Sequence, residues 1–249
     1  MHAVKTNVAL CAVALVTGCG GGGSVDPAPA TSTSPEGLYY GRTSTGRSII
    51  GLVLDDGSYY VIYSSVLFSN LISGVVQGDG TSNAGTFSSG NARDFNLEGL
   101  GVLPATVTAS FVAKQSLNGA TTYNTGSTTS FSGTYDAKYE LTPTLVALAG
   151  TYDGALASSA GVENASVTVS TAGVVAGSGV SGCAVSGSVA PRTRGNVYNI
   201  ALTFGGSPCR FPNQTLTGIA YFEASTNRLY ASAPNASRAD ALLFVGMKP

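Results

Sequence analysis

The stretch SIIGLVLDDGSYYVIYS, residues 48–64, decides the fold class. Two runs of β-branched and aromatic residues, which favour strands, flank the tripeptide DDG at 55–57. Glycine supplies the positive φ that a tight hairpin turn requires, so the stretch predicts two antiparallel strands joined at this turn. Because side chains alternate across a strand, the second run has two faces: Tyr59, Val61 and Tyr63 on one, Tyr60 and Ile62 on the other.

The same signature recurs along the chain between Gly, Asn and Ser residues that favour turns. It marks the segments 105–113, 165–170, 196–204, 215–223 and 240–248, the last with Leu243 and Val245 on one side. No stretch carries a sustained apolar pattern at helical spacing. The sequence therefore predicts an all-β fold built from antiparallel meanders.

An internal echo indicates how these strands are grouped. GLYYG at 37–41 resembles GTYDG at 150–154. Each is followed by a hairpin-like stretch, VLDDG at 53–57 and VSTAG at 169–173. Two copies of one β-meander explain this spacing.

A second echo pairs residues 130–140 with residues 215–225. From both echoes we expect two tandem related β domains, 36–145 and 146–249, each a small closed barrel or a sandwich. Closure into a barrel removes the exposed sheet edges that favour aggregation. One larger sandwich or barrel is the alternative, because single all-β domains reach this length.

The amino-terminal residues have the three parts of an export signal: Lys5 in a short polar start, an apolar run at 8–16, and small residues before Cys19. The run is too short for a membrane-spanning helix, which needs about 20 residues. The tetrapeptide VTGC at 16–19 resembles the lipobox of bacterial lipoprotein signal peptides. This resemblance implies removal of residues 1–18 and diacylation of Cys19; an ordinary signal peptide with an incidental cysteine is the alternative.

Residues 19–35 join the lipidated cysteine to the first β domain. They consist almost entirely of Gly, Ser, Thr, Pro and Ala, without apolar periodicity, which is typical of a flexible linker. By the same resemblance, Gly20 in place of an aspartate implies delivery to the outer membrane. We therefore expect a lipid-anchored outer-membrane protein, on the periplasmic face or at the cell surface.

Besides Cys19, two cysteines remain after removal of the signal: Cys183 and Cys209. In an exported chain such a pair most often forms a disulfide, which contributes about 3.5 kcal/mol in the loop-entropy model. The single histidine, His2, is lost with the signal, and no second cysteine pair completes a tetrahedral ligand set. We predict a disulfide, no metal site and no cofactor.

The composition of the mature chain argues against the commonest hydrolases, because Ser-His-Asp and Cys-His sites need an imidazole. Ser110 and Lys114 would lie about 13 Å apart on one strand, too far for proton transfer. Lys138 and Lys248 are expected to be solvated surface residues. We predict no catalytic residue and a protein that is not an enzyme.

Paired carboxylates leave an envelope hydrolase as an alternative, because glycoside hydrolysis needs two acids about 5 to 10 Å apart. The turn at 55–57 already explains Asp55 and Asp56. Asp136 and Asp153 share the context GTYD and are expected at strand ends. The segment QGDGTSNAG at 77–85 lacks the spacing of an EF-hand, so we interpret it as a mobile loop.

The charge balance gives no strongly basic binding face. With 12 Lys and Arg against 13 Asp and Glu we expect no nucleic-acid partner, although Arg192, Arg194 and Arg210 would form a small basic group if they gathered beside the disulfide. The 12 tyrosines, without any tryptophan, provide either an amphipathic binding face or ordinary strand residues; the second interpretation is favoured.

The lipobox, the glycine-rich tether and the Gly- and Tyr-rich β domains together resemble surface lipoproteins of Gram-negative bacteria, among them transferrin-binding and complement-factor-binding types. The resemblance is one of organisation and carries over no functional residue. It favours a non-enzymatic envelope lipoprotein that binds a protein, a glycan or another envelope component, or has a structural role. A carrier of a small apolar ligand in a β-barrel and a carboxylate-dependent hydrolase are the alternatives.

Overall fold

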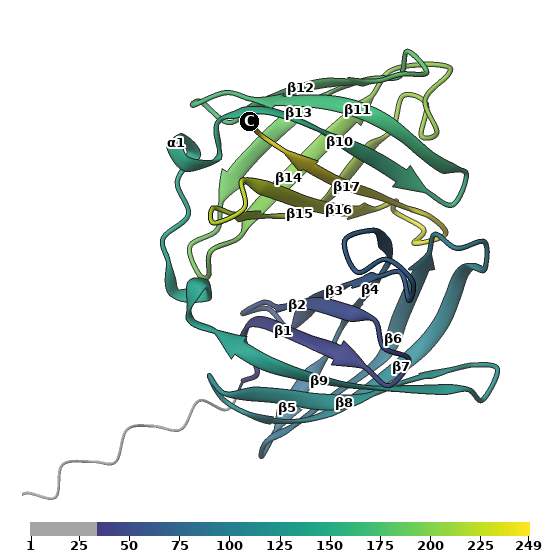
Figure 1. The fold of residues 1–249 in the computed structure, drawn as a ribbon, viewed down its shortest axis with the longest axis vertical. Coiled ribbons are helices and arrows are strands. Elements are labelled where there is room, and N and C mark those ends of the chain that lie inside the picture. The colour runs from purple at the N-terminus through teal and green to yellow at the C-terminus, as the bar shows by residue number, and fades with distance from the viewer. Residues whose placement is uncertain (1–33) are drawn as a thin grey trace, which may run out of the picture. The chain divides into compact units, whose positions relative to one another are not determined.

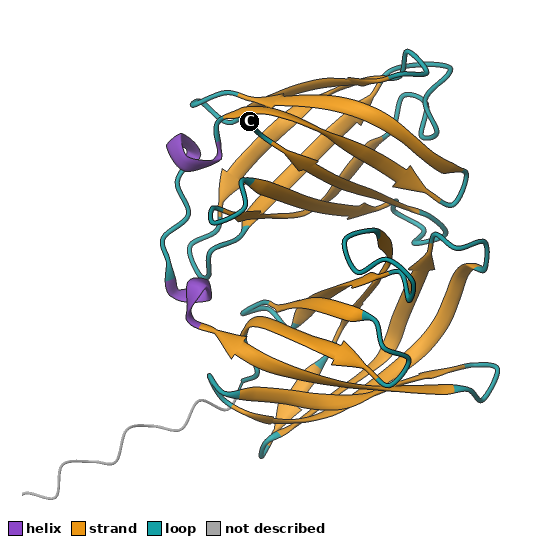
Figure 2. Cartoon of the chain, in the orientation of Figure 1, coloured by secondary structure: helices purple, strands orange, loops and turns teal. Residues whose placement is uncertain are grey.

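The computed structural model describes residues 34–249, so the lipobox, Cys19 and the linker up to residue 33 lie outside the described residues. Two β-barrels follow one another along the described chain (Figure 1). Within residues 34–249, helical structure is limited to two short segments between the barrels (Figure 2). The prediction of an all-β fold with two tandem antiparallel units is confirmed, and the single larger sandwich or barrel is wrong.

The N-terminal barrel is an antiparallel meander in which β1 pairs with β9. Its strands are β1 (Gly37–Thr43), β2 (Ser48–Val53), β3 (Ser58–Ser64), β4 (Ile72–Asp79), β5 (Thr81–Asn83), β6 (Thr86–Asn96), β7 (Gly101–Val112), β8 (Ser116–Tyr123) and β9 (Thr128–Asp136). β4 and β5 act as one interrupted strand, because β5 pairs with the start of β6 and β4 pairs with its end. The pairing of β4 with β6 closes the barrel.

The C-terminal barrel is closed by pairing of its first strand with its last. Its strands are β10 (Gly150–Ser158), β11 (Gly161–Val169), β12 (Val174–Gly179), β13 (Ala184–Pro191), β14 (Tyr198–Phe204), β15 (Thr215–Glu223), β16 (Arg228–Pro234) and β17 (Ala241–Met247). A 3-10 helix (Ala137–Glu140) and α1 (Leu145–Leu148) connect the two barrels. A disulfide joins Cys183, before β13, to Cys209, between β14 and β15.

The hairpin of β2 and β3 forms where the sequence predicts it. Gly57 has a φ of 84°, and the Asp56 carboxylate accepts a hydrogen bond from the Ser58 backbone N–H. The two faces of β3 then go to different environments. Tyr59, Val61 and Tyr63 face the interior of the N-terminal barrel, whereas Tyr60 and Ile62 join an apolar cluster shared by both barrels.

The first sequence echo is a structural repeat. Tyr39 in β1 and Tyr152 in β10 are both fully buried. Each hydroxyl donates to the carbonyl oxygen four residues earlier, Pro35 in one barrel and Leu148 in the other. The second hairpin turn repeats as well, since Gly173 matches Gly57 with a φ of 79°.

The second echo is wrong. Residues 130–140 include β9, the last strand of its barrel, whereas residues 215–225 include β15, which two further strands follow. In the two last strands the equivalent tripeptides are FSG at 131–133 and FVG at 244–246. Their glycines lie opposite Gly41 and Gly154, which occupy matching positions in the first strands.

Side chains of both barrels pack into one shared apolar cluster, so the described residues, 34–249, form one compact unit. Its fully or nearly fully buried members include Leu38, Leu52, Leu54 and Val75 from the N-terminal barrel, and Ile219, Tyr221, Tyr230 and Leu243 from the C-terminal barrel. Ion pairs flank this cluster. Arg192 donates to Asp55 at 2.6 Å and to Asp56 at 3.3 Å.

Candidate functional site

The interior of the N-terminal barrel contains a cavity of about 410 Å3. Small-molecule sites typically have volumes of about 300 to 1,000 Å3. The wall is mainly aliphatic and aromatic and includes Ile49, Val53, Val61, Val76, Leu103, Val107, Leu117 and Phe131. Thr45, Leu100 and Thr125 also line it, and these residues belong to the turns at one end of the barrel. The cavity therefore reaches the surface at that end, which we call the mouth.

Aromatic side chains fill the opposite end of the barrel. Tyr39 packs edge-on against Tyr135 with ring centroids 5.8 Å apart, and Tyr59 packs edge-on against Phe87 at 5.5 Å. The Tyr59 hydroxyl is satisfied by donating to Ser89 Oγ at 3.0 Å. Within residues 34–249, these rings form a floor at the end of the barrel opposite the mouth.

A single carboxylate, Asp94, lines the cavity between the floor and the mouth. Its side chain comes from β6 and the residue is only 3% exposed. Oδ1 accepts a hydrogen bond from the Tyr63 hydroxyl at 2.7 Å, and Oδ2 accepts one from the Tyr123 hydroxyl at 2.8 Å. Burial raises the pKa of Asp94 by more than the two tyrosine hydrogen bonds lower it.

Tyr63 reaches Asp94 across the neighbouring strand β4. It passes directly over Gly74, where a Cβ atom would lie 2.1 Å from the tyrosine hydroxyl oxygen. Only glycine permits this approach. Asn96 Nδ2 donates to the same hydroxyl at 3.1 Å, which holds the ring in place. The position of the carboxylate is thus determined by four strands: β3, β4, β6 and, through Tyr123, β8.

An ion pair stands at the mouth beside this group. Arg47 binds Glu98 through both terminal nitrogens, at 3.1 Å and 2.6 Å, and donates to the Ser64 carbonyl at 2.9 Å. Its guanidinium carbon lies 5.2 Å from the centroid of the Tyr63 ring. Hydrogen bonding to Arg47 lowers the pKa of Glu98. Arg47 is therefore neutralised by Glu98 rather than by Asp94.

Exposed apolar residues lie in loops at the mouth end of the barrel. They lie in the β3–β4 loop and in the turn after β6, and comprise Val66, Leu67, Phe68, Leu71 and Leu100. Leu67 is 82% exposed, and Leu100 is 66% exposed although it also lines the cavity. Single exposed apolar residues are ordinary, but a group at the opening of an apolar cavity marks an interaction site.

The structure disperses the carboxylates that the sequence suggested as pairs. Asp55 and Asp56 bind Arg192 between the barrels. Asp136 caps the 3-10 helix by accepting from the Lys138 backbone N–H, and Asp153 is exposed on β10. Because each has a separate position or an ion-pair role, these residues build no acid pair across a cleft.

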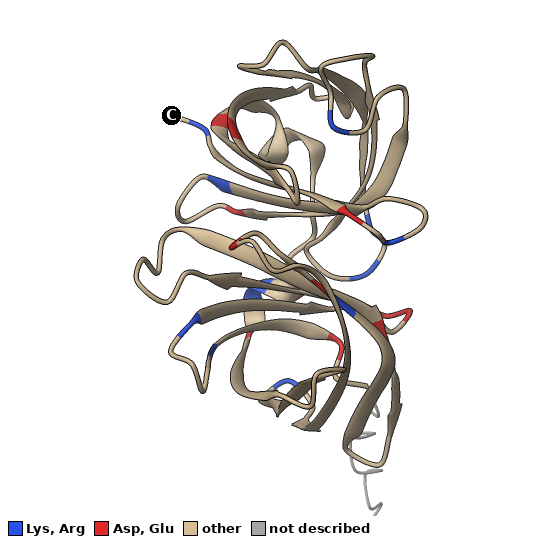
Figure 3. Ribbon diagram, turned by 90° about the vertical axis from the view of Figure 1, so that its right-hand side faces the viewer, with Lys and Arg blue, Asp and Glu red and all other residues tan. Residues whose placement is uncertain are grey.

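The lysine and arginine candidates are also engaged separately. Lys114 pairs with Glu140, Lys138 pairs with Glu223, and Lys248 donates to the carbonyl of Ala147. The three arginines do not gather, since they bind three different acidic partners: Asp55 for Arg192, Glu36 for Arg194 and Asp240 for Arg210. Figure 3 shows charged residues scattered singly over the ribbon.

The segment 77–85 is not a loop, because β4 and β5 occupy most of it. Within residues 34–249 no group of three His, Cys, Asp or Glu side chains is placed to hold a metal ion. In the same part of the chain no helix has the length and hydrophobicity needed to cross a bilayer.

The sequence interpretation missed Asp94 and its partners. Inward positions in β6 begin at odd numbers, with Phe87 and Ser89, and continue at even numbers, with Ala92 and Asp94. A register shift between Ser89 and Ala92 causes the change. A bulge of this kind breaks the period-two pattern, so Asp94 reads as an outward residue. The sequence signal that could have revealed Asp94 was the break, in the middle of β6, in the alternation of inward and outward residues.

Comparisons with known proteins identify no family. The chain matches none of the protein-family models compared with it, and no curated protein matches its sequence. Among solved structures, isotype 1 transferrin binding protein B from serogroup B Neisseria meningitidis matches with a TM-score of 0.32 and 9% identity. That match covers 82% of this chain and 66% of the other, so this chain spans less than two thirds of its length.

Two further solved structures are similar to a comparable degree. HpuA from Kingella denitrificans, solved in complex with human haemoglobin, has a TM-score of 0.31 and 13% identity, covering 88% of this chain and 90% of that one. A candidate outer membrane protein from Bacteroides fragilis has a TM-score of 0.27 and 16% identity, covering 86% and 96%. No site residue is transferred from any of the three.

Proposed function

We propose that this protein is a lipid-anchored outer-membrane lipoprotein that binds, without chemical conversion, a small and largely apolar ligand inside its N-terminal barrel. The observation that carries the proposal is the cavity of about 410 Å3, lined mainly by apolar side chains and open at one end. A barrel of this strand number is either filled by its own side chains or holds one small ligand. This barrel has the space for a ligand, and its exposed apolar rim fits the entry of an apolar molecule.

The chemistry of the cavity supports binding rather than hydrolysis. Acid–base cleavage of glycosides uses two carboxyl groups that face one another across the substrate. Asp94 is the one carboxylate among the residues that line the cavity. The nearby Glu98 is held by Arg47. We therefore assign Asp94 a binding role.

A second candidate function rests on the rim itself. Leu67, Phe68 and Leu100 present apolar surface to solvent, and such surface also suits a protein partner or another envelope component. In this version the cavity would receive a side chain or acyl group of the partner. The two candidate functions differ in their natural ligand: a small free molecule in the first, and a side chain or acyl group of a bound partner in the second. In the second, a small free ligand would compete with the partner for the cavity.

The binding proposal is tested with N-phenyl-1-naphthylamine, a neutral dye that fluoresces in apolar surroundings. We expect saturable binding of one dye per chain to the unacylated Cys19→Ala protein. Thr121→Phe should abolish binding, since Thr121 is buried in the cavity wall. Thr122→Phe is the matched control, because the neighbouring side chain points outward and is exposed. Equal binding by the two variants, or none by the parent protein, would refute the proposal.

The anchor is tested separately. Cys19→Ala should leave the chain unacylated and shift it from the membrane fraction to the soluble periplasmic fraction, because stable anchoring depends on the acyl chains. A protein that stays acylated and membrane-bound after this change contradicts the lipobox assignment. The result does not affect the cavity proposal, since the barrel begins at Gly37.

A further inference from the structure

The charged groups around the cavity do not balance. Asp94 and Glu98 are acidic and Arg47 is basic, and both terminal nitrogens of Arg47 bind Glu98. The other titratable groups in contact with Asp94 are the hydroxyls of Tyr63 and Tyr123, which are neutral donors. An ionised Asp94 is therefore a buried negative charge without a cation of its own.

Such a charge is unfavourable unless something compensates it. A buried carboxylate needs a cationic partner or enough hydrogen bonds to replace its hydration, and two tyrosine hydroxyls satisfy only part of its capacity of about four lone-pair sites. Desolvation accordingly raises the pKa of Asp94. Natural proteins retain such unfavourable groups mainly at functional sites.

The surroundings of Asp94 restrict what can supply the missing charge. Most of the lining side chains are apolar, among them Val61, Val107 and Phe131. The polar ones include Thr43, Thr129 and Arg47, and Arg47 is held by Glu98. The cavity is thus an apolar chamber with one anionic group in its wall.

We infer, building on the proposed function, that the ligand is an apolar amine: a molecule with a hydrophobic body in the chamber and one protonated amino group on the Asp94 carboxylate. A carboxylate or phosphate head would meet Asp94 and Glu98 as like charges. An alcohol donates one hydrogen bond but leaves the charge uncompensated. A hydrogen bond between two charged groups is roughly twice as strong as a neutral one, so an ammonium head is favoured over both.

The experiment compares three ligands that differ only in the head group: octylamine, octanol and octanoate. Octylamine is protonated at pH 7, because alkyl ammonium groups have a pKa of about 10.4. Calorimetry with the full unacylated Cys19→Ala chain should show octylamine binding at least roughly 10-fold more tightly than octanol, and octanoate most weakly. In Asp94→Asn this preference for octylamine over octanol should disappear. Asp153→Asn, an exposed aspartate on the other barrel, is the control and should preserve the preference.

The outcomes separate this inference from the proposed function. Dye and octanol binding without preference for octylamine would overturn the amine assignment and leave the apolar cavity in place. A preference for octanoate would also overturn it and point to Arg47 as the ligand group. A preference that survives in Asp94→Asn would exclude Asp94 as its cause. If neither the dye nor octylamine binds, both proposals fail.

Discussion

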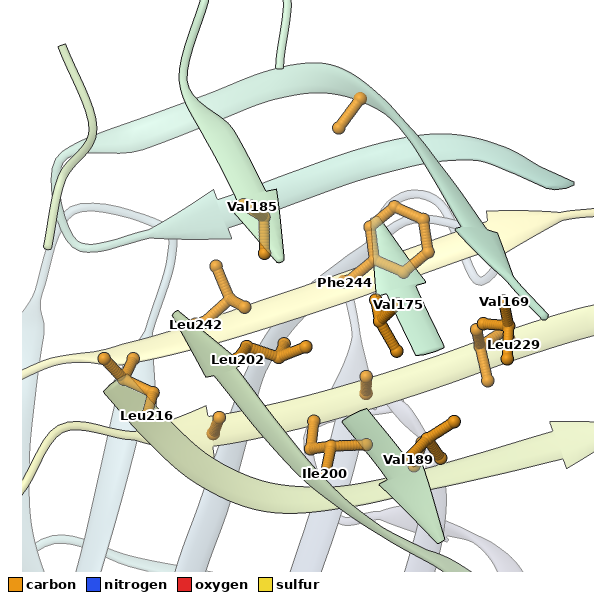
Figure 4. Close-up of a cluster of buried hydrophobic side chains, with 14 of the residues drawn as sticks. Val169, Val175, Val185, Val189, Ile200, Leu202, Leu216, Leu229, Leu242 and Phe244 are labelled. Atoms are coloured by element: carbon orange, nitrogen blue, oxygen red, sulfur yellow. The ribbon is translucent and has the colours of Figure 1, made fainter. Parts of the chain in front are cut away.

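The two barrels share a meander and matching first strands, yet they differ inside. The N-terminal barrel contains a cavity of about 410 Å3, whereas the space among the central inward-facing side chains of the C-terminal barrel is about 40 Å3. A separate pocket of about 460 Å3 lies at one end of the C-terminal barrel, beside the disulfide and the loop before β15. Figure 4 shows how the second interior is filled, by inward-facing side chains that include Val175, Val185, Ile200, Leu202, Leu229 and Phe244. The same scaffold thus has a centre filled by side chains in one barrel and a central cavity in the other.

The two barrels also treat a buried aspartate differently. Asp240 in the C-terminal barrel is 4% exposed and accepts hydrogen bonds from Ser159 and from Arg210. Burial alone would raise its pKa, but these partners outweigh burial and lower it. Asp94 is equally buried but makes no ion pair, and desolvation by burial raises its pKa. The ion pair and hydrogen bonds of Asp240 compensate the burial of its charge in the C-terminal barrel. The burial of Asp94 without an ion pair is unfavourable, and a role in ligand binding would explain why this residue is present.

The largest expected effect comes from truncating one phenylalanine in the last strand of each barrel. Phe131 and Phe244 occupy matching positions, but Phe244 is 3% exposed in a filled core and Phe131 borders the cavity. Phe244→Ala should lower the free energy of unfolding by about 4 kcal/mol, the usual cost of a new core cavity. Phe131→Ala should cost less than about half as much, because its ring is only partly buried and borders the cavity. Urea unfolding of both variants measures the difference.

Equal losses for the two variants would contradict the contrast between hollow and filled interiors. The dye experiment gives an independent control on the same proteins. Phe131→Ala enlarges the cavity and should retain dye binding, whereas Phe244→Ala leaves the cavity wall unchanged.

Removal of the disulfide is the next largest effect. Replacing Cys183 and Cys209 together by alanine should reduce the stability of the C-terminal barrel by about 3 kcal/mol, because the unfolded chain is no longer cross-linked. Dye binding at the same temperature should be unchanged, since both cysteines belong to the filled barrel. Loss of dye binding together with stability would show instead that the two interiors depend on one another.

The fold was predictable because its signals are local. The hairpin at 48–64 combines β-branched runs with a DDG turn, and its strands form as expected. The repeat of Tyr39 and Tyr152 was visible because each tyrosine is flanked by glycines in a short motif. The cysteine count led directly to the single disulfide pair. Each inference needed only neighbouring residues or a count.

The cavity was not predictable from the sequence, because it depends on the sizes of inward-facing side chains on strands that are far apart in the chain. Thr121 and Thr129 read as ordinary strand residues, and only the closed barrel shows that they line a cavity. Asp94 was hidden by the register shift in β6. The second echo failed for a related reason, since glycine-rich strand sequences resemble one another without occupying matching positions. Long-range pairing, rather than local propensity, decides these features.

The smallest expected effect is the change in the pH dependence of stability on replacing Asp94, and it is the most direct test of whether the Asp94 carboxylate lacks a cationic partner. Burial raises the pKa of Asp94, so between the ordinary carboxyl pKa and the raised native value the native state binds more protons than the unfolded chain. The stability that Asp94 contributes is therefore fully present below the unfolded pKa and is lost as pH rises through the native pKa. Asp94→Asn removes the charge but keeps a hydrogen-bonding group, and it should raise the free energy of unfolding at pH 7 by about 1 kcal/mol.

Asp240→Asn is the matched control in the other barrel and should have the opposite sign. The pKa of Asp240 is lowered, so its contribution is present above the unfolded pKa and is lost as pH falls through the native pKa. Its replacement should cost roughly 1 to 3 kcal/mol at pH 7, because Arg210 and Ser159 lose a charged acceptor.

Around Asp94, Tyr63 and Tyr123 stay neutral over this range because their pKa values are raised, while Arg47 and Glu98 stay charged as a pair. Urea unfolding measured from pH 4 to pH 8 should therefore give two difference curves of opposite slope. If Asp94→Asn destabilises the protein at pH 7 as Asp240→Asn does, then Asp94 is a structural group with adequate partners, and the charge that the amine is inferred to satisfy does not exist.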